Sequence, residues 1–179
     1  MKTPLLIILF AACLLAGVHV QAQSVDKLSE KNGFKTLVLG SDITAIKSKL
    51  EYLSSDHSLD RDSCYYQDYK DTALYSIGDI KLTGVTLRIF KNKILSIIIT
   101  FDKKNGPDLM AVYLKAFGLY SERPNRFMDK YYWYSPNVKL FLNYDLTSKL
   151  PMAMYTSVPL NDEVERNSRD KTKKAVSDL

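Results

Sequence analysis

Two runs of alternating apolar residues, separated by a short polar turn, constrain the fold of this chain more than any other feature. Every second residue is apolar from 85 to 89 and again from 95 to 101. A period of two places these side chains on one face of a β-strand. The turn at 91–93, Lys-Asn-Lys, has the composition of a hairpin connection. Ile94 and Ile98 add apolar residues to the opposite face of the second strand, which predicts a central strand covered on both sides.

The remaining pattern predicts helices and further strands. In 42–53, apolar residues recur at helical spacing behind a Ser-Asp pair that can cap a helix. In 107–117 a second apolar stripe follows a proline at the first helical position and ends before Gly118. A polar helix is predicted from Asn161, with acids in its first turn and lysines near its end. The predicted strands are 34–39, 64–69, 80–89 with a β-bulge at Gly84, 131–134, 138–144 and 152–158.

These elements define an α+β fold, in which an antiparallel sheet has helices packed on one face and is followed by a polar C-terminal helix. Their order repeats weakly, because each half contains a helix, an aromatic strand and two apolar strands. We therefore predict a single α+β domain over 23–160, with α-β-β-β half-repeats at 34–101 and 106–158. The polar C-terminal helix occupies 161–179.

Two segments resemble parts of known exported proteins. Residues 33–43, Gly-Phe-Lys-Thr-Leu-Val-Leu-Gly-Ser-Asp-Ile, look like the opening of many small exported bacterial proteins, in which a short strand and a glycine precede the first helix. Residues 89–97 look like their hairpin of strand, Phe-x-Asn-x and strand. Over 34–158 the layout is similar to the repeated helix-plus-sheet units of β-lactamase-inhibitor-protein-like folds, including small outer-membrane assembly lipoproteins. The resemblance implies a fold and, as one function, inhibition of a secreted enzyme, although a fold alone does not fix function.

The first 22 residues have the layout of a secretory signal peptide. One lysine precedes an uncharged apolar run from Pro4 to Val20, and the run closes on Val-Gln-Ala, which a signal peptidase can read. We expect cleavage near Ala22, export to the periplasm or the medium, and no transmembrane helix in the mature chain. Lipid attachment at Cys13 is the disfavoured alternative, because the preceding Phe-Ala-Ala has Phe where a lipobox usually has Leu.

Composition argues against most catalytic and cofactor chemistry. The mature chain has one histidine, His57, and one cysteine, Cys64, which together are too few for a zinc site and allow no internal disulfide. A thiol dyad of these two residues is less favoured than a buried Cys64. The acidic run from Asp56 to Asp71 lacks the turn glycine of an EF-hand loop, and a solvated acidic loop is favoured over a calcium site. We predict no metal, no cofactor and no enzymatic activity.

Charge patterning disfavours nucleic acid as a partner. The formal net charge is +5, but the basic residues are interspersed with acids and form no clustered patch.

Two aromatic clusters supply the candidate binding residues. In a strand, neighbouring side chains point to opposite faces, so Tyr131 and Trp133 cannot share a face with Tyr132 and Tyr134. One set should pack in the core and the other should be exposed, where aromatic residues favour contact with a partner. Packing within the sheet is the competing interpretation. The candidates are Tyr65, Tyr66, Tyr69, Tyr131, Tyr132, Trp133 and Tyr134.

The sequence therefore predicts an exported, non-catalytic binding protein. Its expected partner is a protein or a component of the cell envelope, contacted through an aromatic sheet surface. An inhibitor or immunity-type protein that binds a secreted enzyme is the alternative. A hydrolase that uses Asp60 and Asp62 of the acidic loop is the third and weakest hypothesis.

Overall fold

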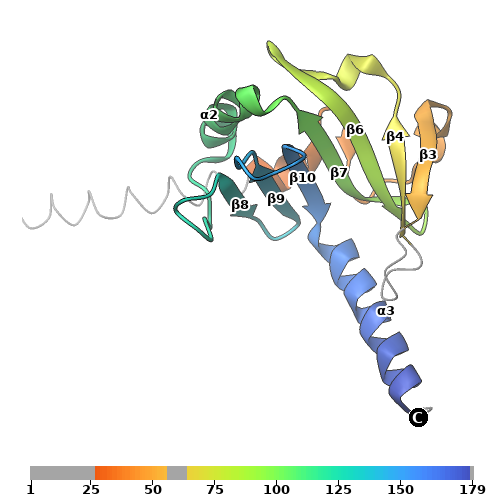
Figure 1. The fold of residues 1–179 in the computed structure, drawn as a ribbon. Helices are drawn as coiled ribbons and strands as arrows, with labels where there is room; N and C mark the ends of the chain where they lie inside the picture. Colours follow the sequence, from red (N-terminus) through yellow and green to blue (C-terminus); the bar gives the residue numbers. More distant parts are fainter. Residues whose placement is uncertain (1–26, 56–63, 178–179) are drawn as a thin grey trace, which may run out of the picture.

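The computed structural model describes residues 27–55 and 64–177, and an antiparallel sheet forms the centre of this part of the chain (Figure 1). The strand order is β3-β4-β6-β7-β10-β9-β8, and the short β5 also pairs with β6. In chain order the strands are β3 (Leu50–Ser55), β4 (Cys64–Tyr69), β5 (Ser76–Ile77), β6 (Ile80–Phe90), β7 (Lys93–Phe101), β8 (Lys130–Tyr134), β9 (Val138–Asn143) and β10 (Met152–Ser157). The α+β fold with a large antiparallel sheet, predicted from the sequence, is confirmed.

The β6–β7 hairpin lies where the sequence predicts it, but the predicted turn at 91–93 is one residue too long, because Lys93 already belongs to β7. Phe90 pairs with Lys93, so Lys91 and Asn92 alone form the turn. Both turn residues have positive φ, 49° and 60°, as a type I′ hairpin turn requires. The β6–β7 register shifts between Leu82 and Gly84, which is the β-bulge expected at this glycine. β7 lies in the middle of the sheet, next to β10.

The predictions for the N-terminal region are wrong in two places. The expected strand at 34–39 is instead a tight hairpin of β1 (Gly33–Phe34) and β2 (Leu37–Val38), because Lys35 turns the chain with φ of 52°. The expected helix at 42–53 is a 3-10 segment, η1 (Thr44–Lys49), followed by β3. η1 buries none of its residues, whereas β3 pairs with β4 along its length. Strand pairing at the sheet edge therefore replaces the last turn of the predicted helix.

Two longer α-helices border the sheet, and a short helical segment at 27–31 precedes β1 and buries Leu28 in the core. α2 (Gly106–Phe117) starts with a proline in its first turn and stops at Gly118, whose φ is 75°, as predicted. α3 (Val158–Ser177) begins three residues before the predicted start at Asn161, so Val158 ends no strand and opens the helix instead. Only Val164 of α3 is buried, and the helix extends away from the sheet toward the C-terminus (Figure 1).

The main core lies on one face of the sheet, under α2 and the N-terminal hairpin. Across this face the register aligns Leu87, Ile97, Tyr155, Leu140 and Trp133 in one continuous row. Each of these side chains is at most 3% exposed. Such close-packed apolar rows supply most of the favourable free energy of folding.

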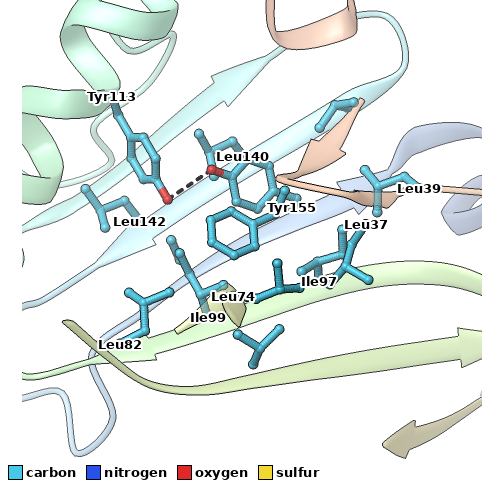
Figure 2. Packing of buried hydrophobic residues seen from close by; sticks show 14 of the residues in the cluster. Leu37, Leu39, Leu74, Leu82, Ile97, Ile99, Tyr113, Leu140, Leu142 and Tyr155 are labelled. Carbon is cyan, nitrogen blue, oxygen red and sulfur yellow. Dashed lines mark hydrogen bonds between the residues drawn. The ribbon is translucent and has the colours of Figure 1, made fainter. Parts of the chain in front are cut away.

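Tyr113 joins α2 to this core. Its hydroxyl accepts a hydrogen bond from the hydroxyl of Tyr155 at 3.1 Å (Figure 2). Its ring also meets the rings of Trp133 and Tyr155 edge-on, with centroids 5.8 and 6.2 Å apart. Because both hydroxyls are buried, their mutual bond satisfies polar groups that would otherwise be costly to place in the core.

The two predicted half-repeats contribute strands in mirrored order. The first gives β4, β6 and β7, together with β3 at the sheet edge and the short β2 and β5, whereas the second gives only β8, β9 and β10. The last strand of each half meets the other at the β7–β10 pair. The helix of the first half is replaced by η1, so the halves differ at the position where the repeat was expected to begin. The duplication and the domain limits stay predictions.

The predicted signal peptide, including Cys13 and Ala22, lies outside the described residues. Within 27–55 and 64–177, no helix combines the length and the apolar character needed to cross a membrane.

Replacing Leu140 by Ala should destabilise the protein. Leu140 is completely buried in the central row, so its truncation leaves a cavity and should lower the free energy of unfolding by about 2–5 kcal/mol. Leu146, which is 85% exposed, provides the matched control, and Leu146→Ala should stay within about 0.5 kcal/mol of the parent. Urea unfolding measures both values. Equal effects of the two substitutions would contradict this assignment of the core.

Candidate functional site

β8 separates its aromatic residues between the two faces of the sheet. Tyr131 and Trp133 are buried in the core at 6% and 2% exposure, and the indole Nε1 of Trp133 donates to the carbonyl of Gly118 at 2.9 Å. Tyr132 is half-buried and Tyr134 is 39% exposed, both on the opposite face. The alternation predicted within this cluster is confirmed, and only the second pair is available to a partner.

The β4 candidates divide in the same way. Tyr69 is buried in the core, and Tyr65 packs against that core while its hydroxyl donates to Asn92 Oδ1 at 3.4 Å. Tyr66 pairs with Arg88 in register and therefore lies on the face that carries Tyr132 and Tyr134. The sheet thus brings three of the seven candidates to one face and packs the other four in or against the main core.

The strand register aligns a polar row across that second face. Arg88 of β6 pairs with Ser96 of β7, Ser96 pairs with Thr156 of β10, and Thr156 pairs with Lys139 of β9. The hydroxyls of Ser96 and Thr156 are 3.1 Å apart and hydrogen-bond to each other. Because every pair in the row is antiparallel and adjacent, residues distant in the sequence become neighbours. The polar row comprises Tyr66, Arg88, Ser96, Thr156, Lys139 and Tyr134.

An aromatic platform overlaps the end of the polar row, with which it shares Lys139 and Tyr134. The ring of Tyr132 stacks on Phe141 with centroids 4.8 Å apart, and it also stacks along the strand on Tyr134 at 5.9 Å. Lys139 places its ammonium 4.9 Å from the Tyr132 ring centroid and 5.1 Å from that of Tyr134. A cation at these distances is attracted to the faces of both rings. We call Tyr132, Tyr134, Phe141 and Lys139 the aromatic platform.

A half-open hollow of about 330 Å³ lies between the platform, the polar row and the start of α3. This volume is at the lower end of the range for small-ligand pockets. Its apolar walls are Tyr132, Phe141 and Met154, and the remaining walls carry charges, hydroxyls and an amide. The lining residues are Arg88, Ser96, Tyr132, Lys139, Phe141, Met154, Thr156, Asn161 and Glu165.

The first turns of α3 limit the second face on one side. Val164 and Leu160 pack on a small apolar cluster of Cys64, Phe90 and Leu95, separate from the main core. Lys91 of the hairpin turn also forms an ion pair with Glu163 at 2.7 Å. The helix is therefore anchored where it borders the hollow, and the remainder of α3 is not buried.

The phenol of Tyr134 is held in its neutral form. Partial burial raises the pKa of Tyr134 to about 12, and its hydrogen bond to Glu122 Oε2 at 2.6 Å adds to the increase. The negative charge of Glu122 contributes further, because it disfavours a phenolate beside it. Tyr134 therefore presents a fixed, uncharged ring at the edge of the platform at neutral pH.

The structure gives little support to the thiol and acidic-loop chemistry considered from the sequence. Cys64 is buried at 2% exposure, and His57 lies outside the described residues, as do Asp56, Asp60 and Asp62. Asp68 accepts from Thr86 Oγ1 at 2.7 Å, and Asp71 forms an ion pair with Lys49. No group of three or more metal-ligating side chains occurs within 27–55 and 64–177.

Sequence reasoning missed most of the hollow. Arg88, Lys139, Phe141, Met154 and Glu165 were not named as candidates. Alternation relates Lys139 to Phe141 within β9 and Met154 to Thr156 within β10, but it does not relate one strand to another. These residues become neighbours through the register between strands, which a single sequence does not show. In comparisons with known proteins, no family model, no curated protein and no solved structure matched this chain.

Removing the Tyr134 hydroxyl should change the response of stability to alkaline pH. Because folding raises the pKa of this phenol, its contribution to stability is complete below about pH 10 and is lost as pH rises toward about 12. In Tyr134→Phe, the free energy of unfolding should therefore fall less steeply with pH above about 10 than in the parent. Urea unfolding at a series of pH values measures the slopes.

Glu122→Gln provides the second variant for this measurement. It removes the negative charge beside the phenol but keeps an acceptor, so the slope should lie between those of the parent and Tyr134→Phe. Three parallel curves would contradict the assigned Tyr134–Glu122 interaction.

Proposed function

We propose that this protein is an exported, non-catalytic binding protein that contacts a protein or cell-envelope partner through the second face of its sheet. The observation that carries the proposal is the aromatic platform. Tyr134 is 39% exposed on a face that does not hold the main core, and Tyr132 and Lys139 lie directly beside it. Tyrosine rings on a rigid strand favour binding because they offer a large contact area at low cost in side-chain entropy.

The rigidity of the platform supports recognition rather than simple surface exposure. Tyr132 is fixed between two stacked rings, and Tyr134 is fixed at its hydroxyl by Glu122. β8 is in turn covered at its outer edge, where Tyr132 exchanges backbone hydrogen bonds with Glu122. A surface that is already ordered loses little conformational freedom on binding, which favours affinity.

The chemistry of the hollow supports a binding role over a catalytic one. The hydroxyls of Ser96 and Thr156 bond to each other, and within the described structure neither bonds to a carboxylate or an imidazole that could activate it. The proposal therefore assigns no reaction to these side chains. Export rests on the signal-peptide pattern of residues 1–22 and is part of the proposal.

Replacing Tyr132 and Tyr134 together by Ala should abolish binding of the partner. Residues at the centre of an interface commonly contribute enough that their truncation weakens binding by about tenfold or more. The measurement is affinity capture from the envelope extract of the source organism with residues 23–179 as bait, read by mass spectrometry. The identity of a captured protein decides the alternative, since a secreted hydrolase held at equal stoichiometry would indicate an inhibitor.

Two controls separate lost binding from lost folding. Trp133 is left unchanged, because it is buried in the core and its removal would disturb the fold. Tyr52 is the matched control. It is 59% exposed, and its pairing with Gln67 places it on the face of the sheet opposite the aromatic platform. Tyr52→Ala should capture the partner normally. Circular dichroism checks the fold of each variant. A partner retained by the folded double variant would refute the proposal.

A further inference from the structure

We infer that two adjoining loops at one end of the sheet bind the surface of an anionic lipid bilayer. The inference goes beyond the proposed function, because it uses residues outside the aromatic platform and the hollow. Residues 123–130 lead into β8, and residues 144–151 join β9 to β10. Lys130 pairs with Asn143 and Asn143 pairs with Met152, so both segments lie at the same end of the sheet. We call residues 123–130 and 144–151 the loop tip.

The loop tip carries the most exposed large apolar side chains of the described residues. Phe127 is 80% exposed and Leu146 is 85% exposed, and Leu150 adds a third at 52%. Single exposed apolar residues are common on protein surfaces. Here, however, they come from two segments that are bonded to each other, since the backbone N–H of Tyr144 donates to the carbonyl of Asp129 at 3.0 Å. The fold therefore places together apolar side chains that it does not use for its own core.

Cations from three parts of the chain gather at the loop tip. The guanidinium of Arg126 lies 4.7 Å from the ring centroid of Phe127. Lys103 of η3 (Lys103–Asn105) donates from its Nζ to the carbonyl of Leu146 at 2.8 Å. Because these segments are distant in the sequence, the sequence alone shows no basic cluster. The cations of the loop tip and of the segment bonded to it are Lys103, Arg123, Arg126, Lys130 and Lys149.

The acids of the loop tip are fewer, and both already have partners. Asp129 forms an ion pair with Arg123 at 3.6 Å. Asp145 is 5% exposed and accepts from the backbone N–H of Thr147 at 2.9 Å. The five cations remain in excess even when Asp108, in the first turn of the neighbouring α2, is counted with these two acids. Those that form no ion pair within the described residues are Lys103, Arg126, Lys130 and Lys149.

Hydrogen bonds within the loop tip favour a bilayer over a protein partner. The backbone N–H of Phe127 donates to Asn125 Oδ1 at 2.9 Å, and Lys103 satisfies the carbonyl of Leu146. The main chain beside both projecting side chains is therefore already bonded, as insertion requires, because lipid tails offer no partner to a backbone group. Fluid lipid also closes around a projecting side chain, whereas a protein must supply a pocket that fits it.

The two contributions should act together. Binding at a bilayer surface scales with the apolar area that is buried and with the attraction of cations to anionic lipid. Two or three apolar side chains give a small area, so the charges are needed as well. We therefore expect reversible binding that requires anionic lipid and weakens with salt.

The test uses residues 23–179 and vesicles of two compositions. This chain includes every residue that the structure describes and omits the apolar run 4–20, which would bind lipid by itself. Vesicles of phosphatidylcholine are compared with vesicles of equal parts phosphatidylcholine and phosphatidylglycerol. Flotation measures binding at salt concentrations that give Debye lengths of about 10 Å and about 3 Å. At low salt, binding to the anionic vesicles should be tighter by about tenfold or more, and high salt should remove this preference.

Two double variants separate the apolar contribution from the charges. Phe127→Ala with Leu146→Ala should weaken binding to the anionic vesicles about tenfold, because two apolar side chains are no longer buried. Arg126→Gln with Lys149→Gln should weaken it by a similar factor, since each cation near an anionic surface contributes about fivefold. All four side chains are exposed, so both variants should fold, and circular dichroism checks this.

The matched controls lie away from the loop tip. Leu53→Ala removes a side chain that is 53% exposed on β3, at the sheet edge opposite β8. Lys173→Gln with Lys174→Gln removes two exposed cations near the end of α3, which begins where β10 ends rather than where it starts. Both controls should bind the anionic vesicles as the parent does.

A fluorescence measurement reports insertion directly. Phe127→Trp keeps an aromatic ring at the loop tip, and brominated acyl chains in the anionic vesicles should quench its emission. Trp133 is 2% exposed in the core, so the emission of the parent should be quenched little under the same conditions.

Several outcomes would overturn the inference. They are equal binding to the two kinds of vesicle, no binding at low salt, equal quenching of Phe127→Trp and the parent, or binding that is unchanged in the Phe127→Ala, Leu146→Ala variant. A captured protein that this variant loses, with no vesicle binding by the parent, would assign the loop tip to a protein instead. The proposed function fails separately, since Tyr132→Ala with Tyr134→Ala should still bind the vesicles, and the loop-tip variants should still capture the partner of the aromatic platform.

Discussion

The pairing of β7 with β10 is the contact on which the rest of the structure depends. These strands come from distant parts of the chain, and their antiparallel register aligns Ile97 with Tyr155 on one face and Ser96 with Thr156 on the other. The apolar pair fixes the register, because a shift by one residue would move buried side chains to the opposite face. The hydroxyl pair, and with it the order of residues across the second face, follows from that choice.

The same register separates the main core from the face that carries the proposed binding surface. One face carries the packed rows and the Tyr113–Tyr155 hydrogen bond, which hold α2 on the sheet. The other face carries a small apolar cluster at the start of α3, and its remaining side chains are free to be polar or aromatic. Substitutions of exposed residues on the second face should therefore affect the proposed binding at little cost to folding. This holds as long as the buried residues that alternate with them along each strand are left unchanged.

Local signals in the sequence predicted the elements that local geometry determines. The place of the hairpin turn, the bulge at Gly84 and the end of α2 at Gly118 each follow from backbone preferences of a few neighbouring residues, although the turn is one residue shorter than the predicted 91–93. The helix predicted over 42–53 was wrong because its apolar residues, Ile43 to Leu53, fit a helical stripe as well as a turn followed by a strand. Its true state depends on β4, whose pairing with β3 is a tertiary contact. The sequence pattern of one segment carries no information about its pairing with a distant strand.

The candidate site was predictable to the same extent. Alternation along β8 indicated which of its tyrosines share a face. This assignment required only the two-residue period of a strand. It did not state that Lys139 would stand between Tyr132 and Tyr134, because this depends on the register of β8 with β9. Nor did it place Arg88 in the same row, since four strand pairings separate it from Tyr134. A binding surface on a sheet is assembled across strands, so its chemistry becomes visible only when the order and the register of all its strands are known.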